Sequence, residues 1–336
     1  MDWAAVAAHL AGHGLTLLPG ENPRFPGGFA NRNYLIRLAT GSDEVLAVLR
    51  RPPPGPLPPG AHDMAREHRI LSRLPDALAF VPRSFHLCED ERVIGVKFQI
   101  LQYREGVVIR DTLPTEFEGR GSELSEMMLT TLAAIHAVDP GPLGLGDLGR
   151  PDGFLARAVE GWLRRGAAVQ GGALLEELGA WLRANAVPDG PPTLLHNDFK
   201  LDNIILDPAS LRPNAVVDWD QGTRGDPLFD LATLLSYWTE PGDPPAMHEL
   251  QQMPTAEPGF MTREQAALRW SALTGRDVSD IRFHRVLGIV KLAVIFLQLH
   301  ALYRRGATTD PRYAGFGALA QGLLAFGREV AAGRTF

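Results

Sequence analysis

The sequence predicts an α+β fold with a strand-rich first hundred residues and a mainly helical remainder. Residues 34–38 and 45–49 alternate between inward- and outward-facing side chains around the turn-forming residues 41–43, which predicts a β-hairpin. Residues 93–103 form a further apolar run of strand-like composition. Beyond residue 120, apolar residues recur mostly at helical spacing, so the second part of the chain is expected to consist mainly of helices.

Local signals predict the remaining elements of the strand-rich part. Asp2 is a suitable N-cap for a helix over residues 2–12, which should end near Gly14. Residues 52–60 are rich in proline and are expected to form a stiff, extended connection. A helix with a clear apolar stripe is predicted over residues 63–74.

The larger, C-terminal part is expected to contain several helices and one irregular segment. Residues 286–303 are strongly apolar but include Lys291, so a buried helix is favoured over a membrane span. Residues 239–264 are rich in proline, glycine and acidic residues, and are expected to form a surface insertion. The other helices are predicted over residues 123–138, 152–166 and 173–186 and within 262–306 and 315–332.

Chemically distinctive residues are concentrated between residues 194 and 219. Two short apolar runs, 204–206 and 215–217, flank a group of turn formers and are expected to pair as a second hairpin. The loop that leads into this hairpin contains His196, Asp198, Lys200, Asp202 and Asn203 within eight residues.

The second hairpin is expected to bring two oxygen-bearing side chains together. If Ile204 faces Val217 in the antiparallel pair, Asn203 faces Asp218. Amide and carboxylate oxygens suit a hard cation such as Mg²⁺, which takes few protein ligands and leaves the rest to phosphate and water. Asp220 lies two residues after Asp218 on the same side of an extended chain and could add to this metal site.

The loop has the H-x-D-x-x-x-x-N spacing of a phosphoryl-transfer site, in which the aspartate orients the acceptor hydroxyl and the asparagine holds metal. With the following V-D-W segment, it resembles the aminoglycoside phosphotransferase family of kinase-like enzymes, whose loop usually reads H-G-D-x-x-x-x-N. Within that family the chain is similar to kinase-like domains related to those fused to some acyl-CoA dehydrogenases, and the similarity covers nearly the whole chain.

This resemblance implies a protein-kinase-like fold with two lobes. Residues 1–103 would form the N-terminal nucleotide-binding lobe, and residues 104–336 the C-terminal catalytic and substrate lobe. ATP and Mg²⁺ would bind in the cleft, and the γ-phosphoryl group would pass to a hydroxyl of a small molecule. Asp198 would act on that hydroxyl. Lys200 would approach the transferring phosphoryl group, although a solvated lysine is an equally good interpretation.

The resemblance also implies a set of nucleotide-binding residues. The small, polar segment 27–33 could fold over phosphates, although its glycines also suit a simple turn. Arg50 stands where the family usually has lysine, and Glu67 is its expected ionic partner, with an exposed helix glutamate as the alternative. Adenine would bind at the hinge between the lobes. The cofactor-binding residues expected on these grounds are Gly28, Asn31, Arg50, Glu67, Gln102 and Tyr103.

Other polar residues near the motif are expected to be structural. His196 should point inward and support the loop, and His136 should be a packed core histidine. Asp226 is a suitable N-cap for a helix that starts at Pro227. Asp230, in the first turn of that helix, belongs to a G-D-P-x-x-D-L-A pattern that in the family supports the catalytic loop.

Composition limits the function classes. A formal net charge of −6 argues against nonspecific nucleic-acid binding. The single cysteine, Cys88, excludes an intramolecular disulfide and is expected to be a buried apolar residue. One cysteine suits a reducing compartment, and no basic segment precedes the first apolar residues. The sequence therefore predicts a cytoplasmic protein without a secretory signal or a membrane partner. The oligomeric state is not predicted.

The phosphoryl acceptor is the least constrained part of the prediction. An aminoglycoside is a polycation and would need several acidic side chains, for which the segment 239–264 is the main source. The acyl-CoA-dehydrogenase-related branch implies a hydroxyacyl-type acceptor instead, whose phosphates Arg104, Arg110 or Arg157 could meet. The competing classes are a nucleotide-binding module without turnover, which Arg50 favours, and a protein kinase, which the missing D-F-G to A-P-E segment disfavours.

Overall fold

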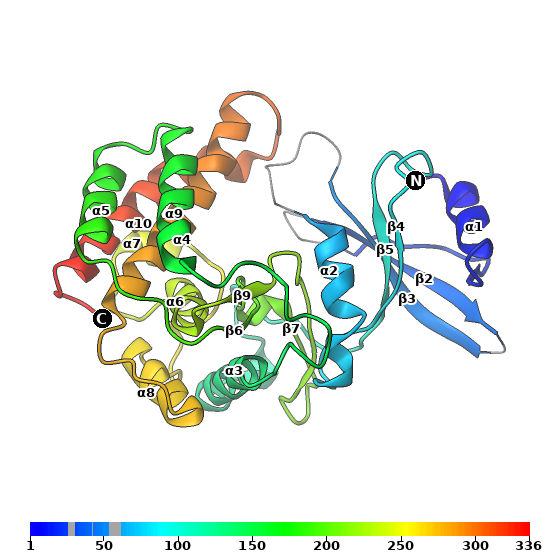
Figure 1. The fold of residues 1–336 in the computed structure, drawn as a ribbon, viewed down its shortest axis with the longest axis horizontal. Helices are drawn as coiled ribbons and strands as arrows, with labels where there is room; N and C mark the ends of the chain where they lie inside the picture. The colour runs from blue at the N-terminus through cyan, green and yellow to red at the C-terminus, as the bar shows by residue number, and fades with distance from the viewer. Residues whose placement is uncertain (26–30, 42, 54–61) are drawn as a thin grey trace.

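The computed structural model describes residues 1–25, 31–41, 43–53 and 62–336. It shows a small, strand-rich N-terminal lobe beside a larger, mainly helical lobe, which confirms the predicted α+β class (Figure 1). The chain leaves the small-lobe sheet after Gln102, and Val107 already exchanges backbone hydrogen bonds with Leu206 of the large lobe.

The small lobe is an antiparallel sheet with one helix on each face. Within the described part of the chain the sheet has five strands in the order β1-β2-β3-β5-β4. Helices α1 (Trp3–Ala11) and α2 (Met64–Leu71) lie on opposite sides of it (Figure 1). The strands are β1 (Thr16–Leu17), β2 (Arg32–Thr40), β3 (Asp43–Arg51), β4 (Ser84–Cys88) and β5 (Phe98–Gln102).

The sequence signals for this lobe are mostly confirmed. Asp2 and Asp63 cap α1 and α2 by accepting hydrogen bonds from backbone N–H groups in the first turns. The predicted hairpin is the β2–β3 pair, with Leu38 opposite Val45. The strand expected over residues 93–103 is wrong in its first half. Gly95 N–H bonds to Glu91 in a turn, so the strand begins only at Phe98.

The large lobe surrounds two short strand pairs with helices. In one pair β6 (Thr193–Leu195) runs antiparallel to β9 (Thr223–Gly225), and in the other β7 (Ile204–Leu206) to β8 (Pro213–Val216). The helices are α3 (Gly121–His136), α4 (Phe154–Ala167), α5 (Ala173–Ala184), α6 (Pro227–Tyr237), α7 (Pro245–Glu249), α8 (Arg263–Thr274), α9 (Arg282–Arg304) and α10 (Phe316–Ala331).

Helix α9 is the central support of the large lobe. It is long and apolar enough to span a membrane by length and composition, but most of that stretch is buried, and it packs against α6 and α10. This agrees with the predicted buried helix. The hydrophobic core around it extends to Ile70 and Leu74 at the end of α2, whereas a second, smaller core lies between α1 and the sheet.

The segment 239–264 lies only partly on the surface, where its composition predicted an insertion. Thr239, Met247 and Thr255 are buried, and Thr239 exchanges backbone and side-chain hydrogen bonds with Thr255. Two of its acids, Glu240 and Asp243, pair with Arg263, which is 1% exposed. The other acids of the segment, Glu249, Glu257 and Glu264, are exposed. The sequence alone does not show that Arg263 is buried against Glu240 and Asp243.

Candidate active site

The predicted catalytic loop lies between β6 and β7, and hydrogen bonds to Asp230 hold it in place. The Asp230 carboxylate, fully buried in the first turn of α6, accepts hydrogen bonds from the N–H groups of His196 at 2.8 Å and Asn197 at 2.7 Å. Burial raises the pKa of Asp230, but the hydrogen bond from His136 and the neighbouring charges outweigh this, so that its pKa is lowered overall. The loop therefore rests on an ionised, fully hydrogen-bonded carboxylate.

His196 and Asp226 have the predicted structural roles. His196 is fully buried, and its Nε2 donates to the Val217 carbonyl at 2.9 Å, which connects the loop to the residue directly after β8. Asp226 accepts from Leu228 N–H at 2.9 Å as the N-cap of α6, and Pro227 is the first helical residue. His136 is a packed core histidine in contact with Trp270.

Asp198 is held by hydrogen bonds on both carboxylate oxygens, and Oδ2 also accepts from the Asn203 amide at 3.3 Å. Lys200 Nζ donates to Oδ2, and the Tyr237 hydroxyl donates to Oδ1, both at 2.9 Å. Burial raises the pKa of Asp198, but Lys200 and Lys291 lower it by more, so its pKa falls below the ordinary value. The carboxylate is therefore ionised at neutral pH, and Oδ1, which accepts from Tyr237, keeps a lone pair for a further donor such as a hydroxyl.

Lys200 is enclosed rather than solvated. It is 8% exposed and lies between Asp198 and Asp202, with its ammonium 3.4 Å from the Asp202 carboxylate. Burial opposes its charge, but the two carboxylates raise its pKa well above the ordinary value. The alternative of a solvated lysine is wrong, and a permanent positive charge beside Asp198 remains.

The register of the second hairpin differs by one residue from the prediction. Ile204 pairs with Val216, and the Val217 N–H donates to Asn203 O at 2.9 Å, so Asn203 lies opposite Val217 and not Asp218. The pairing shifts at an irregularity between Ile205 and Leu206, where Pro213 has no N–H to donate.

The metal-ligand candidates are still grouped around the catalytic loop. Asn203 Nδ2 donates to the Asp198 carbonyl at 2.8 Å, which leaves the side-chain oxygen of Asn203 as the atom available to a cation. Asp218 adopts a left-handed backbone conformation, with φ of 69°, two residues after the end of β8. Asp220 is 6% exposed, and burial, together with the charges of Asp218 and Glu67, raises its pKa well above the ordinary value. Crowded carboxylate and amide oxygens of this kind fit Mg²⁺.

Arg50 connects the small lobe to this group. Its Nε donates to Glu67 Oε2 at 2.8 Å, and its Nη2 contacts the Asp218 carboxylate. Glu67 is fully buried and also accepts from Trp219 N–H at 3.1 Å and from the Gln99 side chain. The predicted Arg50–Glu67 pair is present, and the alternative of an exposed Glu67 is wrong. The same guanidinium also contacts a predicted metal ligand, which the sequence did not indicate.

The remaining candidates for nucleotide binding are placed less favourably for contact with a nucleotide. Gly28 lies outside the described residues. Asn31 is 6% exposed, and its Oδ1 accepts from His62 at 3.0 Å. The N–H of Gln102 donates to Arg83 O at 2.7 Å and that of Tyr103 to Leu46 O at 3.4 Å. Because both N–H groups already donate to other residues, adenine recognition by Gln102 and Tyr103 stays a prediction, and it would involve their backbone carbonyl groups.

Two residues beside Asp198 were missed by the sequence analysis. Tyr237 ends α6, and Lys291 lies in the middle of α9, where its Nζ donates to the Asn197 carbonyl. Burial lowers the pKa of Lys291 to about 8. Tyr237 lies in the helix that begins with the G-D-P-x-x-D-L-A pattern, which is only a weak signal for a role at the site. Lys291 was noted in the sequence only as a charged residue within an apolar stretch.

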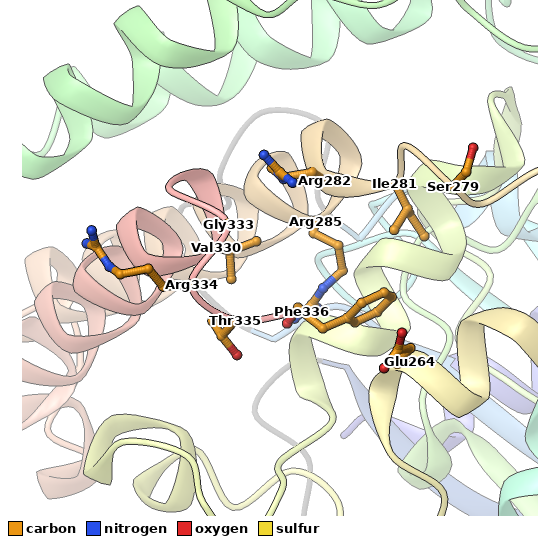
Figure 2. Close-up of a pocket in the computed structure, with 10 residues that line it drawn as sticks. All are labelled: Glu264, Ser279, Ile281, Arg282, Arg285, Val330, Gly333, Arg334, Thr335 and Phe336. Carbon is orange, nitrogen blue, oxygen red and sulfur yellow. The ribbon is translucent and has the colours of Figure 1, made fainter.

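A separate cavity lies at the other end of the large lobe. It has a volume of about 320 Å³ and lies where α9, the start of α8 and the segment after α10 meet, with Arg285 directed toward Phe336 (Figure 2). Its lining includes no residue of the catalytic loop or of the Arg50–Glu67–Asp218 group. This cavity therefore does not mark the phosphoryl-transfer site.

We expect substitutions at the metal-ligand candidates to weaken Mg²⁺-dependent nucleotide binding. Asn203→Ala and Asp218→Ala each remove one oxygen ligand, and the affinity for MgATP should fall by at least about tenfold. Titration calorimetry with and without Mg²⁺ measures this, with the exposed Asn185→Ala as the matched control. An unchanged MgATP affinity in both variants would show that the metal assignment is wrong.

Comparison with known proteins supports the family resemblance. The model of the phosphotransferase enzyme family matches residues 21–268. Acyl-CoA dehydrogenase family member 10 of Mus musculus is 32% identical over 295 residues, which cover 86% of this chain and 27% of that protein. The chain thus spans about a quarter of the length of this relative. The match confirms the predicted similarity to the acyl-CoA-dehydrogenase-related branch.

Solved structures confirm the two-lobe, kinase-like fold. A Ralstonia eutropha protein assigned to the aminoglycoside phosphotransferases has a TM-score of 0.77 and 24% identity, covering 99% of this chain and 98% of that one. An aminoglycoside phosphotransferase of Streptomyces rimosus in complex with ADP and streptomycin has a TM-score of 0.50 and 18% identity, covering 87% of this chain and 99% of that one.

Proposed function

The chain belongs to the phosphotransferase enzyme family, and on that premise we propose that it transfers the γ-phosphoryl group of ATP to a hydroxyl of a small molecule. The observation that supports this most is the grouping of Asp198, Asn203 and Asp218 around one loop, with Arg50 reaching them from the other lobe. The complex of the Streptomyces rimosus neighbour with ADP supports an adenine nucleotide as donor.

In the proposed reaction the acceptor oxygen forms a bond to the γ-phosphorus while the bond to the β-phosphate oxygen breaks and ADP leaves. The ionised Asp198 orients the hydroxyl and receives its proton, and the charge of Lys200 lies beside the transferring group. Mg²⁺, held by Asn203, Asp218 and Asp220, would neutralise phosphate charge. Arg50 takes the place of the usual lysine.

For the acceptor we propose a hydroxyacyl-type metabolite rather than an aminoglycoside. Glu240 and Asp243 form ion pairs with Arg263. The segment 239–264, the main source of acids for binding a polycation, therefore offers less free negative charge than its sequence suggested. The mouse relative belongs by name to the acyl-CoA dehydrogenases. Arg157 is already bound to backbone carbonyls, whereas Arg110 is exposed in the segment after Gln102. A cytoplasmic location stays a prediction.

The acceptor proposal is tested by a coupled assay of ADP release. We expect saturable, acceptor-dependent ADP release with hydroxyacyl-CoA thioesters and none with the matching acyl-CoA thioesters that lack the hydroxyl. Kanamycin-type compounds serve as the second substrate class. Efficient phosphorylation of those compounds, with none of the hydroxyacyl thioesters, would overturn the choice and favour an aminoglycoside phosphotransferase.

One observation favours a second candidate, a nucleotide-binding module without turnover. Arg50 contacts Asp218, so its guanidinium competes with a cation for the same carboxylate. ATP binding without acceptor-dependent ADP release, over a broad panel of hydroxylated compounds, would favour this alternative.

A further inference from the structure

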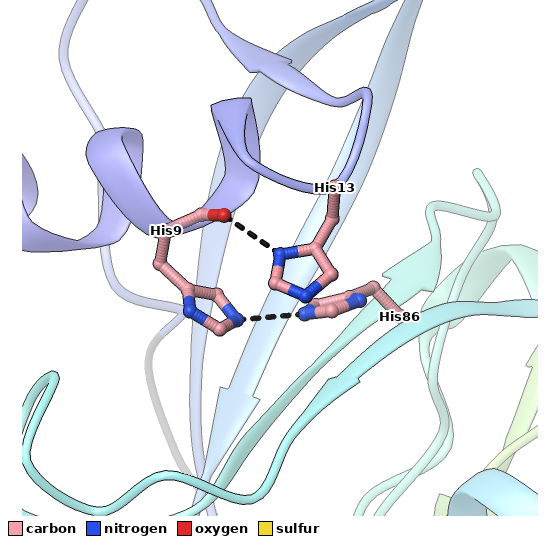
Figure 3. A group of neighbouring side chains, drawn as sticks. All are labelled: His9, His13 and His86. Atoms are coloured by element: carbon pink, nitrogen blue, oxygen red, sulfur yellow. Dashed lines mark hydrogen bonds between the residues drawn. The ribbon is translucent and has the colours of Figure 1, made fainter.

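Three histidines from two separate parts of the small lobe come together away from the catalytic loop. His9 lies in α1, His13 in the turn after it, and His86 in the edge strand β4 (Figure 3). One nitrogen from each ring can be chosen so that all three lie within 4.8 Å of one another. The Nε2 atoms of His9 and His86, from residues 77 positions apart, share a hydrogen bond of 2.9 Å, which a bound metal ion would replace.

The surroundings of two of these rings favour the tautomer that a metal ligand needs. His13 Nδ1 is 2.8 Å from the His9 carbonyl, which can only accept, so Nδ1 carries the hydrogen and Nε2 keeps its lone pair. His9 Nδ1 lies 4.0 Å from the Cys88 sulfur, whose own S–H donates to Asp90 O. A metal-binding histidine is oriented in the same way, through a hydrogen bond from its other nitrogen.

The cluster is partly enclosed by the protein. The His9 and His86 rings are half-buried between α1 and the edge strand β4. His13 is exposed, so one side of the cluster is open to solvent.

We propose that His9, His13 and His86 form a site for a divalent transition-metal ion such as Zn²⁺. Imidazole nitrogens suit zinc, copper and nickel rather than Mg²⁺, and three histidines leave a fourth position for water. The bound ion would link α1 to β4 across the outer face of the sheet. The bound metal would thereby stabilise the small lobe, because it binds the folded chain and not the separated segments. This site is independent of the proposed phosphoryl transfer.

Cobalt titration tests the site directly. The full chain, freed of metal by a chelator, is titrated with Co²⁺ in excess Mg²⁺, which occupies oxygen sites, and the visible absorption of imidazole-bound cobalt is followed. We expect one Co²⁺ per chain, displaced by Zn²⁺. His13→Ala should weaken binding by at least about tenfold, since it removes one ligand. His248→Ala, at an exposed histidine outside the cluster, is the matched control and should bind as the unmodified chain does.

Thermal unfolding provides a second measurement that does not depend on activity. Zn²⁺ should raise the Tm of the unmodified chain and of His248→Ala, and leave the Tm of His13→Ala unchanged. Because His13 is exposed, its replacement should not disturb the fold, and circular dichroism checks this. If no cobalt absorption appears, or if His13→Ala binds cobalt as tightly as His248→Ala, the cluster is only a stack of packed rings and the proposal is overturned.

Discussion

Asp198→Asn is expected to lower turnover by about 100- to 10,000-fold while ATP binding is retained. The substitution keeps the shape of the side chain but removes the charge that accepts the acceptor's proton. One of the two donors, Lys200 or Tyr237, would lose its oxygen acceptor. The loop should nevertheless keep its position, because its backbone N–H groups still donate to Asp230. Steady-state kinetics with a working acceptor measures the turnover, and titration calorimetry measures ATP affinity.

The control for this substitution is Asp111→Asn, which changes the same residue type at an exposed position. It should leave turnover and nucleotide affinity unchanged. Equal turnover in Asp198→Asn and Asp111→Asn would remove Asp198 from the mechanism. A loss of ATP binding together with turnover would show instead that Asp198 acts on the nucleotide site.

Arg50→Leu is expected to lower the free energy of unfolding by about 3–5 kcal/mol. Glu67 is fully buried, and without Arg50 its charge would lose its cationic partner, as would that of Asp218. Burial already raises the pKa of Glu67 despite the opposing effects of Arg50 and of the Trp219 N–H, so the hydrogen bonds from Trp219 and Gln99 alone should not compensate for the lost guanidinium. Denaturant unfolding at constant pH measures the effect.

The matched control is Arg37→Leu on the neighbouring strand β2. Its partner Glu44 lies at the same 2.8 Å separation, but both side chains are more than half exposed, so the change should cost at most about 1 kcal/mol. The double variant Arg50→Leu/Glu67→Leu should be more stable than Arg50→Leu alone, because the fully buried charge of Glu67 is no longer left unpaired. An equal cost at Arg50 and Arg37 would contradict the account of this pair.

Local sequence signals were sufficient for the elements whose ends carry their own chemistry. Asp2 and Asp63 cap helices where expected, the turn residues around Gly41 close the first hairpin, and Asp226 with Pro227 starts α6. In each case the residues that decide the element lie within a few positions of it, so a single stretch of sequence contains the whole signal.

The errors arose where distant segments decide the outcome. The edge strand β4 was not predicted, and the apolar run beginning at Val93 was read as strand although residues 91–95 form a turn. Whether Glu240 faces solvent depends on the buried Arg263. The predicted hairpin register assumed that Ile204 faces Val217, whereas Ile204 pairs with Val216, so Asn203 lies opposite Val217 and not opposite the predicted metal ligand Asp218.

The residues around Asp198 were also only partly predictable from local sequence. The loop motif predicted which residues gather there, because their spacing is local. Tyr237 and Lys291 reach the loop from α6 and α9, and nothing in their own sequence neighbourhood indicates that contact. The Arg50–Glu67 pair was predictable only because the family resemblance supplied the long-range partner.

The central claim, phosphoryl transfer to a small-molecule hydroxyl, is tested most directly by identifying the product. Phosphorus NMR of the chain with ATP, Mg²⁺ and a panel of hydroxylated metabolites should show a new phosphomonoester and equimolar ADP. Both should be lost in Asp198→Asn. ADP with free phosphate but no phosphomonoester from any acceptor, or a phosphomonoester formed equally well by Asp198→Asn, would contradict the account.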